Sequence, residues 1–209
     1  MSKSTIKQKT TPKRDPETRI IAAGRKLFLK HGYSGVTTDM LVREASASKA
    51  TLYKYFPDKA AILVKVLERE GDTFMVAPDD LPDEREAYLD ALKGFGTGLL
   101  TLLSKREIRG FEHLVITESR HIPDIAAEFY KATYDRTFEN LTRLIGAGLE
   151  RGWIQSKLTA EQASDALISL WASRLQDRDR FGVKPDGSES PADRVHFGLN
   201  LVFPDAYGS

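Results

Sequence analysis

Apolar residues recur every three or four positions along most of the chain, the spacing that lets an α-helix bury one face. The first such stretch is preceded by Asp15 and Pro16, a pair that favours a helix start through side-chain capping and a preset φ. It is followed by Gly32, which suits the left-handed residue that commonly ends a helix. The pattern therefore predicts a first helix from Pro16 to His31.

The next predicted helices are short and closely spaced. Thr37 can cap a second helix, the stretch 46–48 has the composition of a tight turn, and Pro57-Asp58 separates a third helix from a fourth. We expect these helices over 38–45, 49–56 and 59–70, followed by a linker from Gly71 to Pro82.

Beyond the linker the pattern is helical throughout. The alternation of β-branched residues that marks a strand is absent, so we predict an all-α fold. The expected divisions are a flexible basic arm (1–14), a domain of short helices with a linking fourth helix (15–70) and a domain of long helices (83–209). The long helices are expected over 84–104, 108–120, 123–151, 160–178 and 191–202, with a loop over 179–190.

Composition indicates a folded globular protein, because 41% of the 209 residues are hydrophobic and 29% are charged. The absence of cysteine excludes a disulfide scaffold, a thiolate metal site and a cysteine nucleophile. No apolar run reaches the roughly 18 residues of a membrane span, and the N-terminus lacks the apolar core of a secretory signal. We therefore expect a cytoplasmic protein with no membrane partner.

The net charge of +1 conceals a division along the chain. Residues 1–59 carry 13 Lys and Arg against five Asp and Glu, whereas the remainder carries 18 against 25. Nucleic acid is the commonest polyanionic partner of such a basic segment, although a solvated basic tail has the same composition.

Three short helices with a tight turn before the third are typical of a helix-turn-helix. In this motif the third helix enters the major groove of DNA with polar and basic side chains at its N-terminal end. The corresponding segment runs from Ser48 to Phe56 with the sequence S-K-A-T-L-Y-K-Y-F. Leu52 and Phe56 are four residues apart and are expected in the core, which leaves the polar side chains around them for DNA.

The stretch 16–68 resembles the N-terminal domain of the tetracycline-repressor (TetR/AcrR) family. The resemblance rests on I-I-A-A-G-R-K-L-F beginning at Ile20, on Gly32-Tyr33, and on S-K-A-T-L-Y-K-Y-F-P-D-K beginning at Ser48. The order and spacing of these motifs, followed by an all-helical chain, are more specific than a helix-turn-helix alone.

The sequence departs from the family pattern at three positions. Ser46 stands in the turn where glycine is usual, and serine tolerates the left-handed conformation poorly. Ala50 stands where glycine is common, so its methyl group could touch a thymine methyl or restrict close approach. Gly24 stands where alanine is usual, which suggests close helix packing.

The resemblance implies a ligand-responsive, DNA-binding transcriptional regulator, most simply a repressor, although an activator is not excluded. A homodimer would bind an inverted-repeat operator in double-stranded DNA with recognition helices about 34–36 Å apart, and a small apolar or amphipathic effector would release it. The arm residues Lys3, Lys7, Lys9, Lys13 and Arg14 would follow the DNA backbone or enter the minor groove. The expected DNA contacts are Thr37, Thr38, Ser48, Lys49, Ala50, Thr51, Tyr53, Lys54, Tyr55 and Lys59, of which Ser48, Tyr55 and Lys59 would meet phosphate.

The acidic C-terminal part resembles the regulatory domain of the family more loosely, through the stretch from Phe111 to Pro123. Two apolar helical stripes in this part could pair with those of a second chain in a four-helix bundle, or could complete the core of one chain. The candidate interface residues are Leu167, Leu170, Trp171, Arg174, Phe197, Leu201 and Val202.

An effector pocket is expected among the aromatic and aliphatic residues of the same helices, although such stripes are more often plain core. Three glycines at 94, 96 and 98 inside a predicted helix could make room for a ligand, let the helix bend, or allow close helix packing. His113, Glu118 and Arg174 could supply polar groups. The candidate lining residues are Phe95, Leu99, Leu103, Phe111, Leu114, Val115, Glu118, Phe129, Tyr130, Tyr134, Phe138, Trp171 and Arg174.

No catalytic residues, metal site or cofactor are expected. No nucleophile–base pair stands out, and the spacing of His113, Glu118 and His121 does not place all three on one helix face. Two alternatives stay open: a DNA-binding regulator without an effector, and a helical small-molecule-binding protein or enzyme.

Overall fold

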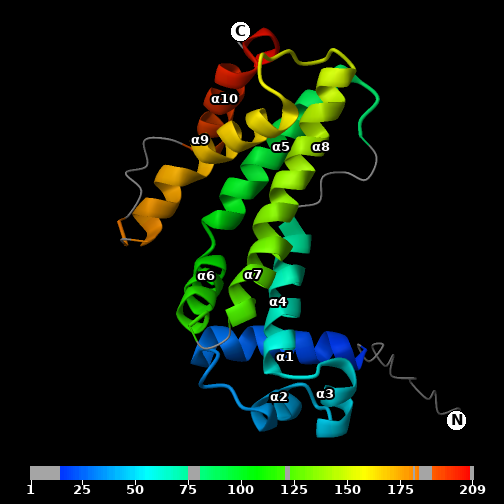
Figure 1. Cartoon of the computed structure of the whole chain (residues 1–209), viewed down its shortest axis with the longest axis vertical. Coiled ribbons are helices and arrows are strands. Elements are labelled where there is room, and N and C mark those ends of the chain that lie inside the picture. Colours follow the sequence, from blue (N-terminus) through cyan, green and yellow to red (C-terminus); the bar gives the residue numbers. More distant parts are fainter. Residues whose placement is uncertain (1–14, 75–80, 121–122, 181, 184–189, 208–209) are drawn as a thin grey trace, which may run out of the picture. The chain divides into compact units, whose positions relative to one another are not determined.

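The computed structural model describes residues 15–74, 81–120, 123–180, 182–183 and 190–207, which form helices and connecting loops with no strand among them (Figure 1). The predicted all-α class is confirmed. The chain divides into two compact units, Met1–Val66 and Leu67–Ser209.

From residue 15 onward, the N-terminal unit is built from three helices and the start of a fourth. They are α1 (Pro16–His31), α2 (Thr38–Glu44), α3 (Lys49–Tyr55) and α4 (Lys59–Phe74) (Figure 1). Helix α1 packs against both α2 and α3, around the buried side chains of Ile20, Phe28, Leu41 and Leu52.

Helix caps and one glycine explain much of this local structure. The side chains of Asp15, Thr37 and Ser48 each accept a hydrogen bond from a backbone N–H in the first turn of the following helix. A Cβ atom at Gly24 would lie 2.8 Å from Cγ2 of Ile62, so glycine there lets α1 and α4 approach closely, as the sequence suggested.

The fourth helix is longer than predicted. It continues to Phe74, so residues 71–74, expected in a linker, are helical. A single glycine inside a helix costs only about 1 kcal/mol relative to alanine, and Gly71 is therefore tolerated.

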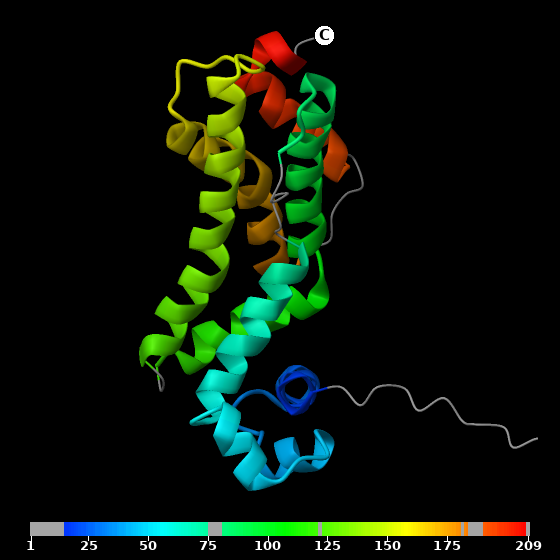
Figure 2. The same ribbon diagram turned by 90° about the vertical axis from the view of Figure 1, so that its right-hand side faces the viewer.

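The end of α4, seven further helices and one π-helical segment make up the described part of the C-terminal unit. Helix α8 packs along α9, and α10 packs against both α5 and α9 (Figures 1 and 2). The elements are α5 (Arg85–Leu103), α6 (Arg106–Glu118), α7 (Pro123–Tyr130), η1 (Lys131–Asp135), α8 (Arg136–Glu150), α9 (Ala160–Arg180), α10 (Pro191–Val202) and α11 (Pro204–Tyr207).

Two features of this unit escaped prediction. The helix expected over 123–151 contains the π-helical turn η1, whose extra residue leaves no mark in the apolar spacing. The four-residue helix α11 is too short to show periodicity. No helix within the described ranges has both the length and the apolarity to cross a membrane.

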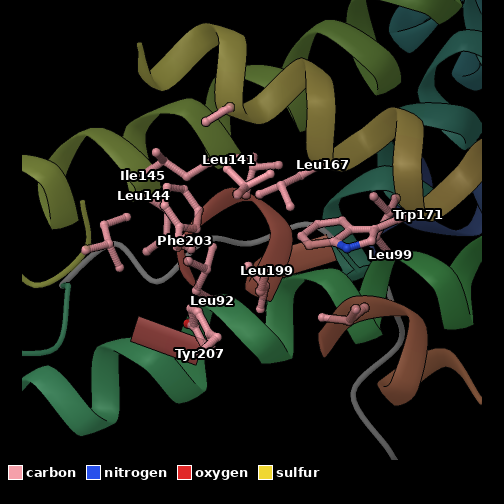
Figure 3. Packing of buried hydrophobic residues seen from close by; sticks show 14 of the residues in the cluster. Leu92, Leu99, Leu141, Leu144, Ile145, Leu167, Trp171, Leu199, Phe203 and Tyr207 are labelled. Carbon is pink, nitrogen blue, oxygen red and sulfur yellow. The ribbon is translucent and has the colours of Figure 1, made fainter. Parts of the chain in front are cut away.

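The core of the C-terminal unit draws buried side chains from α5, α8, α9, α10 and α11 (Figure 3). Trp171 is fully buried between two glycines of neighbouring helices. A Cβ atom at Gly96 would lie 2.9 Å from Cη2 of Trp171, and one at Gly198 would lie 2.4 Å from its Nε1. Close packing therefore accounts for Gly96, whereas a Cβ atom at Gly94 would meet nothing within 4 Å.

Candidate nucleic-acid interface and effector cavity

The start of the recognition helix α3 is held by its own side chains. Ser48 Oγ accepts a hydrogen bond from the backbone N–H of Thr51 at 3.0 Å and lies 2.8 Å from Thr51 Oγ1. Leu52 turns into the core, and Tyr53 on the other side of the helix is 53% exposed. With Lys49, Ala50 and Lys54 also exposed, α3 presents the polar face predicted for it.

An ion pair links the recognition helix to α2. Lys49 Nζ lies 2.8 Å from Asp39 Oδ1, and the Asp39 side chain is 74% exposed. The hydrogen bond and the charge of Asp39 raise the pKa of Lys49. Sequence reasoning missed Asp39, because only the crossing of α2 and α3 brings the two residues together.

The turn between α2 and α3 is held by a residue of α1. Ser46 has a φ of 48°, the left-handed value that its position in the motif indicated. Arg19 Nη1 donates hydrogen bonds to the carbonyl oxygens of Ala45 at 3.0 Å and Ser46 at 2.9 Å. Arg19 was also missed, since its partners lie in a different part of the sequence.

Lys59, expected from the sequence to contact phosphate, is hydrogen-bonded within its own unit. Its Nζ donates to the carbonyl oxygens of Tyr33 at 2.7 Å and Val36 at 2.9 Å, and lies 4.1 Å from the centroid of the Tyr33 ring. An ammonium group has three donors, so these contacts occupy most of its capacity. Lys59 therefore ties the start of α4 to the loop after α1.

The other expected DNA contacts lie around α2 and α3. Thr37 caps α2 by accepting a hydrogen bond from the backbone N–H of Met40 at 3.3 Å, and Thr38 is half-buried behind it. Tyr55 is half-buried, with Lys54 Nζ 5.7 Å from its ring centroid. The expected arm contacts Lys3, Lys7, Lys9, Lys13 and Arg14 lie outside the described residues.

A cavity of about 60 Å³ lies in the C-terminal unit. Tyr134 OH donates a short hydrogen bond to Glu112 Oε1 in its wall. Four expected lining residues border the cavity: Leu103, Phe111, Phe129 and Tyr134. The remaining lining residues, which the sequence did not single out, are Leu67, Leu102, Ile108, Glu112 and Thr133.

The other expected lining residues lie outside this cavity. Leu99, Leu114, Val115 and Trp171 are buried in helix packing, and Glu118 is also buried. Phe95 and Phe138 are half-buried, and Tyr130 is exposed. The side chain of Arg174, also expected at the dimer interface, lies outside the described residues.

The expected interface residues fall into two groups. Leu167 and Trp171 are fully buried in the core of their own unit, which favours the alternative that this stripe completes the core of one chain. Phe197 and Leu201 on α10 are 60% and 62% exposed. Val202 is buried, and Leu170 is half-buried. Leu170, Leu201 and Val202 border an open groove of about 620 Å³.

Within the described ranges, no three His, Asp or Glu residues lie close enough together to hold a metal ion. His121, one of the three residues considered from the sequence, lies outside those ranges.

Comparison with known proteins agrees with this architecture. Residues 20–66 match the family described as bacterial regulatory proteins, tetR family, and residues 90–209 match the C-terminal domain of AefR-like transcriptional repressors. The HTH-type transcriptional repressor SCO4008 of Streptomyces coelicolor is 27% identical over 176 residues, which cover 81% of this chain and 86% of that protein. The repressor NemR of Escherichia coli is 24% identical over 178 residues, covering 82% and 88%.

Solved structures show the same fold. A TetR transcriptional regulator from Agrobacterium tumefaciens has a TM-score of 0.74 and 23% identity, covering 93% of this chain and 98% of that chain. The flavonoid-responsive regulator FrrA has a TM-score of 0.72 and 23% identity, covering 90% and 97%.

Proposed function

The chain belongs to the TetR family of DNA-binding transcriptional regulators, and from this premise we propose that it represses transcription as an effector-released homodimer. In this proposal two copies bind an inverted-repeat operator, each with one α3 in the major groove. A small molecule bound in the C-terminal unit then lowers the affinity for the operator. Regulators of this family are typically dimers that respond to small molecules.

The observation that carries the proposal is the exposed polar face of α3. Lys49, Ala50, Tyr53 and Lys54 are exposed together, while Leu52 anchors the same helix in the core. Rigid support matters because a base-reading side chain must keep its direction to distinguish one base pair from another. Lysine can donate to guanine, and Tyr53 offers both apolar area and a hydroxyl group.

The proposed dimer uses the exposed apolar surface of α10. Phe197 and Leu201 are large apolar side chains on one face of this helix, and the groove beside Leu201 extends to Leu170 on α9. A second copy that covered this surface would remove both side chains from water. Two-fold symmetry of such a dimer would require an inverted repeat in the DNA.

Because α4 is one continuous helix, it could transmit the effect of a bound effector to the DNA-binding helices. Its first residue, Lys59, is hydrogen-bonded within the N-terminal unit, and Leu67 of the same helix lines the cavity of the C-terminal unit. A ligand that displaced Leu67 would act on a helix that also supports the DNA-binding unit. The same displacement would alter the fit of two recognition helices to two half-sites.

Selection from random DNA duplexes at about 150 mM salt tests the proposal, because non-specific binding is weakened at that salt concentration. We expect enrichment of an inverted repeat with half-site centres about 10 base pairs apart. Tyr53→Ala should abolish the enrichment, while Phe197→Glu should yield a monomer that binds the operator weakly. A folded dimer that enriches no sequence would contradict operator recognition by α3.

A regulator without an effector is the alternative outcome, and measurement of operator affinity with ligand present distinguishes the two. If no ligand that binds the C-terminal unit alters operator affinity, the protein is a constitutive DNA-binding regulator.

A further inference from the structure

We propose that the effector is a cation, namely a protonated amine on an aromatic or apolar body, and that Glu112 is the residue that recognises it. The inference rests on the proposed function, because it names the class of molecule that would occupy the cavity of the C-terminal unit. It follows from the hydrogen-bonding groups in the cavity wall.

Among the described lining residues, Glu112 is the one carboxylate, and it is half-buried. Six of the other lining residues are apolar, so a ligand that fills the cavity removes water from the Glu112 carboxylate. A carboxylate that loses water without gaining a donor is strongly disfavoured. Tyr134 OH donates to one oxygen of this carboxylate, and a ligand ammonium group would supply a further donor together with the opposite charge.

The polar groups of the wall disfavour the opposite class of ligand. Tyr134 donates its hydroxyl proton to Glu112, and Thr133 Oγ1 donates to the backbone carbonyl oxygen of Phe129 at 2.7 Å. Both hydroxyl donors in the wall are therefore already used within the protein. A carboxylate or phosphate ligand would meet an acceptor at Glu112 and would have to break one of these hydrogen bonds.

The aromatic side chains around Glu112 also suit a cation. Phe111 and Phe129 line the cavity with Tyr134, and the rings of Phe129 and Tyr134 meet edge to face with centroids 6.1 Å apart. Tyr130 stacks on Tyr134 at 5.1 Å from the outside, which holds the phenol ring in place. The negative face of an aromatic ring attracts an ammonium group.

The π-helical turn η1 provides a way to enlarge the cavity. Its present volume of about 60 Å³ is well below the roughly 150 Å³ of an apolar cavity that holds benzene, so a ring-bearing ligand must widen it. Thr133 and Tyr134 both lie in η1. π-Helical turns are frequent at functional sites, and a shift of this turn moves two wall residues together.

A matched series of small ligands tests the charge preference directly. Benzylamine, benzyl alcohol and benzoate share one ring and differ in charge, and the naphthylmethyl analogues of the amine and the alcohol extend the size range. Binding to the full-length protein is measured by calorimetry and by the shift in unfolding temperature. We expect the amines to bind more tightly than the alcohols, and benzoate not to bind.

Variants at position 112 assign the preference to Glu112. Glu112→Gln should weaken amine binding about tenfold or more while leaving alcohol binding unchanged, and Glu112→Lys should favour benzoate over benzylamine. Glu107→Gln, an exposed change on the same helix α6, is the control and should have no effect.

The inference is overturned if benzoate or the alcohols bind as tightly as the amines, if none of the amines binds, or if Glu112→Gln leaves amine binding intact. Operator binding of each variant without ligand is measured separately. Normal operator binding together with a failed amine series refutes the effector class alone, whereas loss of operator binding by the unaltered protein refutes the proposed function.

Discussion

Arg19 in α1 donates a hydrogen bond from Nη1 to the carbonyl oxygen of Ser46, 2.9 Å away and 27 residues later in the chain. Ser46 is the residue other than glycine whose φ is positive in the described part of this unit. The left-handed conformation costs a non-glycine residue about 1–2 kcal/mol. The guanidinium group therefore stabilises a turn whose backbone is strained, and this turn sets the direction of α3.

Replacing Arg19 should loosen the turn. We expect Arg19→Met to lower the free energy of unfolding by about 1.5–3 kcal/mol, the range for hydrogen bonds that involve a charged group. Lys30→Met, on an exposed position of the same helix, should change it by less than about 0.5 kcal/mol. Urea denaturation of both variants gives the comparison, and equal stabilities would show that Arg19 does not hold the turn.

Relieving the strain at Ser46 should have the opposite effect. Glycine adopts a φ of 48° without a steric penalty, although it also gains freedom in the unfolded chain. We expect Ser46→Gly to raise the free energy of unfolding by about 0.5–1 kcal/mol, and Ser46→Ala to leave it nearly unchanged. A loss of stability in Ser46→Gly would mean that the serine side chain contributes more than its backbone costs.

The short helices could be predicted to within a residue or so because their signals are local. Asp15, Thr37 and Ser48 sit directly before the helices that they cap, and their hydrogen bonds stay within one turn. Contacts between distant segments left no such signal. Lys59 and Tyr33 are 26 residues apart, and nothing in the spacing of either residue indicates the hydrogen bond between them.

Helical periodicity likewise shows which face of a helix is apolar without showing what covers it. The spacing of the apolar stripe on α9 that contains Leu167 and Trp171 is compatible with either a core or an interface. The packing of α5, α8 and α10 around it places both residues in the core. Glu112 was missed for a similar reason, because its role depends on a hydrogen bond from Tyr134 in η1.

Two lysines should separate structural support from DNA contact. Lys59→Met should lower the free energy of unfolding by about 1–3 kcal/mol, because it removes the lysine donor from the carbonyl groups of Tyr33 and Val36. The Tyr33 carbonyl keeps the N–H of Val36 as a donor. The salt dependence of DNA binding should stay unchanged. Lys54→Met, on the exposed face of α3, should keep stability and reduce the slope of log K against log salt concentration by about 1 if it meets phosphate. Titrations of labelled operator between about 50 and 200 mM salt measure the slopes. A reduced slope in Lys59→Met together with unchanged stability would instead indicate that Lys59 contacts phosphate.

Asp39 should limit non-specific binding. Its carboxylate forms an ion pair with Lys49 in the absence of DNA and adds negative charge beside the recognition helix. We therefore expect Asp39→Asn to strengthen binding to DNA of random sequence several-fold. The slope of log K against log salt concentration should become steeper by about 1. The effect should be absent in a Lys49→Ala background, which fluorescence anisotropy can test. An equal gain in both backgrounds would show that Asp39 acts through its charge alone, without Lys49.

Alanine at Gly94 and at Gly96 provides a matched test of why glycines interrupt α5. At Gly96 a methyl group would lie 2.9 Å from both the buried Trp171 ring and Val195 Cγ1, and overpacking of this kind typically costs about 1–3 kcal/mol. At Gly94, which is exposed and has nothing within 4 Å of the added atom, alanine should stabilise the helix by about 0.5–1 kcal/mol. Thermal unfolding should therefore move in opposite directions for the two variants. Gly94→Ala could keep or gain stability and yet abolish the response of operator binding to amines, which would show that this glycine serves effector-induced bending of α5. An unchanged unfolding temperature in Gly96→Ala would show that the packing around Trp171 is looser than its contacts indicate.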